Sequence, residues 1–327
     1  MYLQIMLATT SMQVNRYTRV GIQMQKQQIP LKNSLFLLLA AIIWGIAFVA
    51  QKVGTTDVGP LTFSASRYFL GGLAVLPCAY FFADKNMTKA KLKTSLLAGS
   101  FCGVLLFIAS FLQQIGIQYT TVGKAGFITT LYIIIIPLIG LGFKKKVSLR
   151  IWVSVAIALL GMYLLCLAGG SFTVQTGDFY IFFCAIGFAC QILFIDYYLP
   201  KVEPIYFAMT QFFVAALISL ILLPFFEPLE LSGIISARVS ILYAGLISAG
   251  IGYTLQIIAQ KHVKPVVASM IMSLEAVFSL LAGFIILGDR LSSRELIGCA
   301  LVFTAIILAQ LPTKSANAKT DIMTEML

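Results

Sequence analysis

Two charged residues stand inside long apolar stretches: Glu275 in the stretch 265–287 and Arg67 in the stretch 58–82. A charge in the hydrocarbon core of a membrane costs roughly 2.5–3.5 kcal/mol on insertion scales, so such residues usually have a partner or a function. A carboxylate at that depth can take a proton or bind an amine. A guanidinium can hold a carboxylate by two parallel hydrogen bonds, or tie helices together through its five donors.

Helical spacing puts each charge on a face with mostly small residues. The residues that share a face with Glu275 are Ala268, Met272, Ser279 and Ala282, and those that share a face with Arg67 are Ser64, Gly71 and Ala74. Such faces are typical of contact with protein or with a cavity, so we predict that both charges point inward. Two interpretations stay open for each charge. It belongs to a binding or proton-coupling site, or it is a structural charge satisfied by carbonyls, hydroxyls or the other charge.

Further polar and aromatic side chains follow similar helical faces and are predicted to line the same interior. They are Trp44, Gln114, Thr129, Tyr132, Gln191 and Gln256. Amides and hydroxyls between rigid aromatic walls suit a small amphipathic solute. For any one of these residues, the alternative is hydrogen bonding and close packing between helices.

A proline interrupts the stretch 123–143 five residues beyond Tyr132. Proline removes a backbone hydrogen bond and bends a helix, so we predict a gating bend at Pro137. The alternative is a structural proline of the kind that membrane helices tolerate.

The composition predicts an all-α integral membrane protein. Of 327 residues, 60% are hydrophobic and 11% charged, and the mean hydropathy is +0.96. Ten windows reach the roughly 20 apolar residues that a spanning helix needs. They are roughly 33–53, 58–82, 94–117, 123–143, 147–168, 178–199, 204–226, 238–260, 265–287 and 292–311. This pattern excludes a soluble enzyme, a nucleic-acid-binding protein and a secreted disulfide-rich module. One histidine and six cysteines without CxxC spacing predict neither a metal site nor a cofactor.

The distribution of Lys and Arg predicts the orientation. Seventeen of the 23 fall on one side of the ten predicted helices, including the clusters in 85–93 and 144–150, and five fall on the other. By the positive-inside rule, both predicted tails, 1–32 and 312–327, are cytoplasmic.

The chain also resembles itself at a separation of 143–146 residues. Gly59-Pro60 aligns with Glu203-Pro204, and Tyr132 aligns with Glu275. We therefore predict two five-helix repeats, 33–168 and 178–311. Five is an odd number, so the second repeat enters the membrane inverted. Inverted repeats with a site near mid-membrane are a recurring plan of transporters.

Four short motifs carry a family resemblance. They are Ile43-Trp44-Gly45, Ser66-Arg67-Tyr68, Ser273-Leu274-Glu275-Ala276-Val277 and Leu287-Gly288-Asp289-Arg290-Leu291-Ser292. With ten spans in two halves, the chain resembles the EamA-type transporters of the drug/metabolite transporter superfamily over about 33–311. The resemblance implies a carrier of the inner (cell) membrane for small metabolites, often amino acids or related exported compounds.

Two positions depart from the family's pattern. Ala276 stands where a proline usually follows the glutamate, so no proline kink is predicted there. Tyr132 stands at the counterpart of Glu275, so any carboxylate role is single.

From these features we expect a secondary or facilitative transporter, because the sequence has no ATP-binding P-loop. Its partners would be the lipid bilayer, a small amino-acid-like or other amphipathic solute and, for an exporter coupled through Glu275, protons; no nucleic acid is expected. An intramembrane enzyme, a channel and a lipid or undecaprenyl-type flippase are the alternatives. Monomer and homodimer stay equally open.

Overall fold

Long apolar runs fold as helices, because a backbone in apolar surroundings must satisfy its hydrogen bonds internally. The computed structural model describes residues 31–84, 86–142, 147–166, 175–288 and 293–311, and all regular structure within them is helical. Most of the predicted tails, Lys144–Lys146 and 289–292 of the last motif lie outside the described residues.

The helices of the first half follow one another with short connections. They are α2 (Leu31–Gly54), α3 (Pro60–Phe82), α4 (Lys89–Gly116), η1 (Ile117–Tyr119), α5 (Val122–Thr130), α6 (Tyr132–Gly142) and α7 (Leu149–Cys166).

The second half repeats this order with more interruptions. Its helices are α8 (Thr176–Tyr198), η2 (Leu199–Lys201), α9 (Pro204–Phe226), α10 (Leu231–Ser236), α11 (Arg238–Leu242), η3 (Tyr243–Tyr253), α12 (Thr254–Gln260), α13 (Pro265–Met272), α14 (Leu274–Ala282), η4 (Gly283–Leu287) and α15 (Ser293–Gln310).

Seven helical segments are long and apolar enough to cross a membrane. They are Leu31–Gly54, Lys89–Tyr119, Val122–Gly142, Thr176–Lys201, Pro204–Phe226, Arg238–Gln260 and Pro265–Leu287. The other three predicted spans coincide with α3, which contains Arg67, and with α7 and α15, which have 18 residues each. The count of ten spans stays a prediction.

Carboxylates cap the two matching helices α3 and α9. Both helices begin with proline, whose missing N–H is no loss at that position. Glu203 accepts hydrogen bonds from the backbone N–H groups of the first turn of α9, at 2.9 Å. At α3 the matching residue is Gly59, and Glu227 from the end of α9 accepts from Leu61 N and Thr62 N instead. The end of α9 is thereby fastened to the start of α3.

The fourth span of each half is interrupted near its middle, at Leu131 and at Ser273. The hydroxyl of Thr130 donates to the carbonyl of Phe127, and that of Ser273 donates to the carbonyl of Met270. Such bonds compete with the helix's own bonding and bend it. Thr130 and Ser273 lie 143 residues apart, so the interruptions are equivalent.

The first break does not lie at Pro137, where the sequence predicts a bend, and the second lies where no proline kink is predicted. The helix stays continuous through Pro137, within α6, and its break lies six residues earlier, at Leu131. The second break forms although Ala276 replaces the family's proline. Hydroxyl groups, not prolines, mark both positions.

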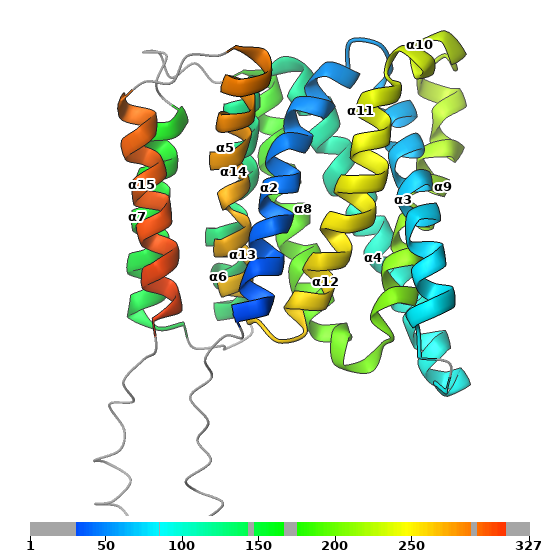
Figure 1. The fold of residues 1–327 in the computed structure, drawn as a ribbon, viewed down its shortest axis with the longest axis horizontal. Helices are drawn as coiled ribbons and strands as arrows, with labels where there is room; N and C mark the ends of the chain where they lie inside the picture. Colours follow the sequence, from blue (N-terminus) through cyan, green and yellow to red (C-terminus); the bar gives the residue numbers. More distant parts are fainter. Residues whose placement is uncertain (1–30, 85, 143–146, 167–174, 289–292, 312–327) are drawn as a thin grey trace, which may run out of the picture. The chain divides into compact units, whose positions relative to one another are not determined.

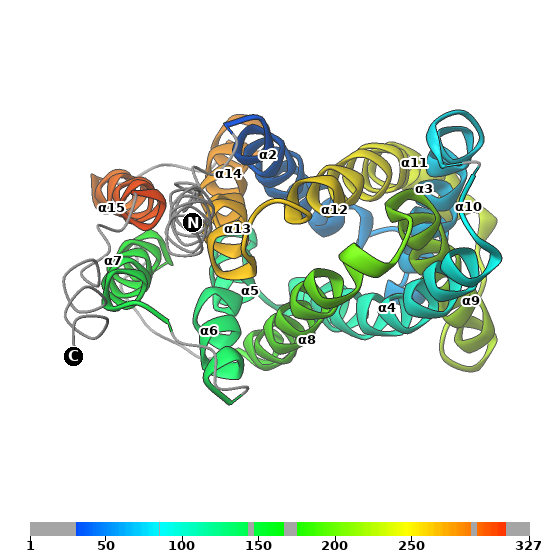
Figure 2. The same ribbon diagram turned by 90° about the horizontal axis from the view of Figure 1, so that it is seen from below.

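The helices of the two halves interdigitate. α7 packs on α15, α3 on α9, α4 on α8 and α9, and α2 on α14 and η3 (Figures 1 and 2). Each of these pairs joins one half to the other, so neither half has a core of its own.

Contacts at one end fix the relative direction of the halves. Lys52, near the end of α2, donates to the carbonyl of Ile117 at the end of α4. Gly116 in the last turn of α4 packs on the backbone of Gly177 at the start of α8. Thus α8 begins at the end of the bundle where α2 finishes, and the two helices run in opposite directions, as an inverted repeat requires.

A close helix approach at Gly45 gives a testable prediction. A Cβ there would lie 2.7 Å from the backbone carbon of Phe278 and 2.8 Å from the nitrogen of Ser279, and backbone cannot move aside cheaply. We expect Gly45→Val to lower the free energy of unfolding by about 1–3 kcal/mol, the usual cost of overpacking. The matched control is Gly142→Val, because nothing lies within 4 Å of that Cβ position. Thermal melting in detergent compares the two, and equal melting temperatures would contradict the predicted clash.

Candidate functional site

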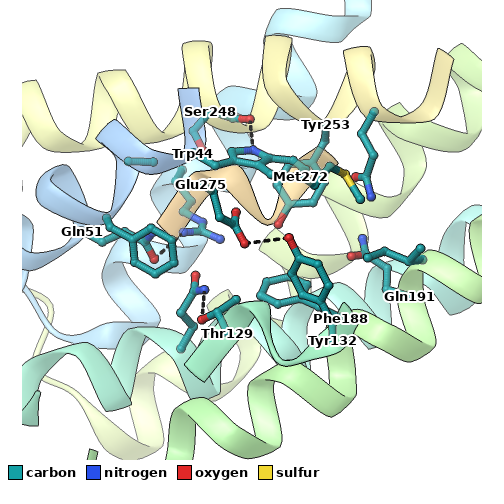
Figure 3. A pocket seen from close by; sticks show the side chains of 16 residues that line it. Trp44, Gln51, Thr129, Tyr132, Phe188, Gln191, Ser248, Tyr253, Met272 and Glu275 are labelled. Atoms are coloured by element: carbon teal, nitrogen blue, oxygen red, sulfur yellow. Dashed lines mark hydrogen bonds between the residues drawn. The ribbon is translucent and has the colours of Figure 1, made fainter. Parts of the chain in front are cut away.

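A cavity lies between the two halves and takes eight lining residues from each (Figure 3). The space inside it that a water-sized molecule can occupy is about 40 Å³. The lining residues are Trp44, Ala47, Phe48, Gln51, Arg67, Gln113, Thr129 and Tyr132 from the first half, and Phe188, Gln191, Ile192, Ser248, Tyr253, Gln256, Met272 and Glu275 from the second. Their even distribution places the cavity at the interface of the repeats.

Glu275 and Tyr132 meet inside this cavity. The Tyr132 hydroxyl donates to Oε1 of Glu275 at 3.0 Å (Figure 3). Tyr132 directly follows the break at Leu131, and Glu275 is the second residue after the break at Ser273. The two residues lie 143 positions apart, so the breaks bring equivalent positions of the two halves together. Glu275 is 5% exposed and Tyr132 3% exposed. The carboxylate therefore has a partner from the other half and still has acceptor positions toward the cavity.

Arg67 is held by its neighbours but keeps one free donor. Its Nη1 donates to Gln51 Oε1 at 3.1 Å, its Nη2 donates to the Tyr68 hydroxyl, and the guanidinium lies 4.4 Å from the centre of the Tyr68 ring. Its Nε is buried and has no hydrogen-bond partner. A buried donor left unsatisfied costs about 1–3 kcal/mol, so this nitrogen would gain from an acceptor in the cavity.

Aromatic rings form one wall of the cavity and reach the arginine. Trp44 Nε1 donates to the carbonyl of Ser248 at 3.3 Å, and its ring centre lies 4.8 Å from that of Tyr253. Tyr253 contacts Phe212, which stacks on Tyr68 at 6.1 Å. Rigid rings in such contact lose little conformational entropy when an apolar group packs against them.

Side-chain amides complete the lining. Gln113 Nε2 donates to the Thr129 hydroxyl at 3.2 Å, and Gln191 Nε2 donates to Gln211 Oε1 at 3.4 Å. Gln256 Oε1 is buried without a partner. The cavity thus offers an unused acceptor at Gln256 besides the unused donor of Arg67.

The structure brings seven of the eight predicted site residues to this cavity: Glu275, Arg67, Trp44, Tyr132, Gln191, Gln256 and Thr129. The eighth, Gln114, is fully buried and does not line the cavity; its Nε2 donates to the carbonyl of Gln51 at 3.4 Å. The neighbouring residue Gln113 lines the cavity in place of Gln114. Pro137 does not line the cavity either.

Sequence reasoning missed Ser248 and Tyr253. They belong to η3, an 11-residue π-helix. A regular spacing of 3.6 residues per turn also places both on the face of Gln256, so that face could have indicated them. A cluster of three glycines is the signal that could have indicated an irregular helix.

The two charges share the cavity without touching. Among the described residues no ion pair within 4.0 Å joins Arg67 to Glu275, and each has neutral hydrogen-bond partners. A cation and an anion held apart in one buried cavity can bind a solute that carries both charges. No group of three or more His, Cys, Asp or Glu side chains suited to a metal ion occurs in the described ranges.

The sequence matches the EamA-like transporter family over residues 31–167 and again over 175–311. An uncharacterized transporter of Archaeoglobus fulgidus is 28% identical over 280 residues, which are 85% of each chain. The uncharacterized transporters YwfM and YoaV of Bacillus subtilis are 26% and 22% identical, over 88% and 85% of this chain and 96% of their own.

A solved crystal structure shares the fold. It covers 85% of this chain and 98% of its own, with a TM-score of 0.71 and 18% sequence identity. At that identity the likeness concerns the helical architecture alone.

Proposed function

The chain belongs to the EamA-like transporter family, and from that premise we propose that it carries a small zwitterionic solute across the cell membrane by alternating access. Its long apolar helices and its transporter relatives make it a multi-pass membrane transporter. The solute is an amino-acid-like molecule with one carboxylate, one amine and an apolar part.

The observation that carries this proposal is the presence of Arg67 and Glu275 in one cavity, each buried and without an ionic partner among the residues that the structure describes. The guanidinium of Arg67, with its free Nε, binds the carboxylate of the solute. Glu275 binds the amine, and the rings of Trp44 and Tyr253 pack on the apolar part. Buried charges without an ionic partner cost free energy. A solute whose amine pairs with Glu275 and whose carboxylate pairs with Arg67 removes that cost, which favours its binding.

Alternating access follows from the arrangement of the halves. The cavity is built equally from both inverted repeats, so a rocking of one against the other opens it first to one side and then to the other. Glu275 also serves as the coupling group, because a proton and the amine of the solute compete for the same carboxylate. Exchange of an entering proton for the bound solute would drive export of the solute.

Thermal stabilisation by a matched solute panel tests the proposal. Each neutral amino acid is compared with its decarboxylated amine and its deaminated acid. A solute that binds only the folded protein raises the melting temperature by mass action, by an amount equivalent to about 2.7 kcal/mol at a hundred times Kd. We expect zwitterions to stabilise the protein more than either partner compound.

Uptake into proteoliposomes then has to saturate with the concentration of the stabilising solute. Stabilisation by lipids alone, or by amines and acids as strongly as by zwitterions, would contradict the proposed substrate class. Flux that does not saturate would indicate a channel.

A further inference from the structure

One ion pair joins the two halves at the end of the bundle where α2 finishes and α8 begins. Lys124 Nζ on α5 lies 2.7 Å from Asp178 Oδ2 on α8, and the two side chains are 22% and 10% exposed. It is not part of the cavity lining. The proposed function therefore leaves it without a role.

Further hydrogen bonds hold the surroundings of this pair in place, and one of them crosses between the halves. Asp178 Oδ1 accepts from the Thr120 hydroxyl at 2.8 Å, and its Oδ2 accepts from the backbone N–H of Gln175 at 2.9 Å. Lys52 donates to three carbonyls of the segment before Lys124, those of Ile117, Gln118 and Thr120, at 2.8–3.1 Å. The end of α2, the segment 117–120 and the start of α8 are thereby fastened together.

An apolar layer lies next to the ion pair and borders the cavity. It is a cluster of buried residues from both halves: Phe48, Val49, Ile117, Val122, Ala125, Ile181 and Ala282. Phe48 also lines the cavity.

Three helices bring the ion pair, the apolar layer and the cavity close together. Along α5, Lys124 lies between Val122 and Ala125 of the apolar layer, and Thr129 of the cavity follows. Along α8, Asp178 is followed by Ile181 of the apolar layer and then by cavity residues. Along α2, Lys52 directly follows Gln51 of the cavity lining, and Phe48 and Val49 of the apolar layer precede both. The ion pair and the apolar layer thus lie side by side at this end of the cavity.

In the described part of the chain, the opposite end has no pair at the equivalent positions. The residues 143–146 positions after Lys124 are Val267, Ala268, Ser269 and Met270, and none of them carries a charge. The ion pair is thus a feature of one end only.

We propose that Lys124 and Asp178 form a latch that closes this mouth of the cavity and opens when the transporter turns to face that side. The inference rests on the proposed function, since a latch matters only to a cavity that opens. A partly exposed ion pair suits the task, because water replaces the lost partner at little cost and the pair can reform in each cycle. By the predicted orientation this is the outer mouth.

Accessibility of the cavity from each side tests the latch without any solute. Thr129→Cys in the full chain reports on the cavity, and a membrane-impermeant maleimide is added to intact cells or to inside-out vesicles. The protein with its native cysteines gives the background. Thr56→Cys, in the exposed turn after α2, identifies the face on which the latch lies. We expect Lys124→Gln and Asp178→Asn to raise labelling of the cavity from the latch side by about two- to fivefold, the usual range for such pairs.

The double variant and a matched lysine make the result specific. Each single change removes the same interaction, so Lys124→Gln with Asp178→Asn is expected to label no faster than either alone. Lys201→Gln, at the other end of α8, is the control and should leave labelling unchanged. Asp178→Asn keeps an oxygen for the N–H of Gln175, and a melting temperature near that of the parent protein verifies folding.

Unchanged labelling in the single variants, additive effects in the double variant, or an equal rise from both sides would overturn the latch. These outcomes are independent of the solute panel. If the latch variants change the labelling but no zwitterion of the panel stabilises the protein, the proposed substrate class is refuted and the latch is not.

Discussion

In protein carrying Glu275→Gln, affinity for the transported zwitterion falls by roughly ten- to a hundredfold, and the remaining binding no longer changes with pH. A hydrogen bond to a charged group contributes about 1.5–3 kcal/mol, which corresponds to this range of Kd. Glutamine keeps the volume and the acceptor for the Tyr132 hydroxyl, so the change removes the charge and little else. Isothermal titration in detergent measures both effects.

The sign of the pH dependence follows from the competition at this carboxylate. In the parent protein, lowering the pH protonates Glu275, which then releases the amine, so the apparent Kd rises as the pH falls. The apparent Kd of the Glu275→Gln variant stays high and does not change with pH over the same range. Glu230→Gln, an exposed carboxylate outside the cavity, is the matched control and should behave as the parent does. A Gln variant that retains the parent's Kd and its pH dependence would exclude Glu275 from binding and coupling.

The second large effect concerns Arg67 and separates the two ends of the solute. We expect Arg67→Met to weaken binding of the zwitterion by roughly ten- to a hundredfold, because a charge-assisted pair with the carboxylate is lost. Binding of the decarboxylated amine should change little, since it never used the guanidinium. Arg67→Lys keeps the charge but not the planar guanidinium. Its affinity for the zwitterion should lie between that of the parent protein and that of Arg67→Met.

Kd values for the zwitterion and for its amine, measured on the same preparations, test this selectivity. The exposed Arg238→Met provides the control for loss of a surface arginine. If Arg67→Met weakens both compounds equally while its melting temperature falls, Arg67 has a structural role through Gln51 and Tyr68 and does not read the carboxylate.

Much of the fold could be predicted because the bilayer restricts the choices. Apolar length alone indicates the spans, and the family assignment based on short motifs is confirmed by the match over both repeats. The helix breaks could not be placed from proline content. They depend on the hydroxyls of Thr130 and Ser273, and many similar hydroxyls in these helices cause no break.

The cavity could be predicted where regular helical spacing holds. Trp44 and Glu275 each lie in a stretch where 3.6 residues per turn applies, and both line the cavity. The sequence predicts Gln114 in the lining, but Gln113 lies there. Two adjacent glutamines differ by about 100° around the helix, and which of them faces the cavity depends on the packing of α4 against α8. The pairing of Tyr132 with Glu275 was contained in the repeat, since equivalent positions of an inverted duplication meet at its axis.

The ion pair at one end has an energetic consequence for the whole cycle. If the two repeats were identical, exchanging their conformations would interconvert the two facing states, and these states would have the same free energy. Lys124 and Asp178 have no counterparts across the duplication, and Tyr132 differs from Glu275. In the proposed alternating-access cycle the empty carrier therefore has a preferred resting orientation, and these unmatched side chains contribute to that preference.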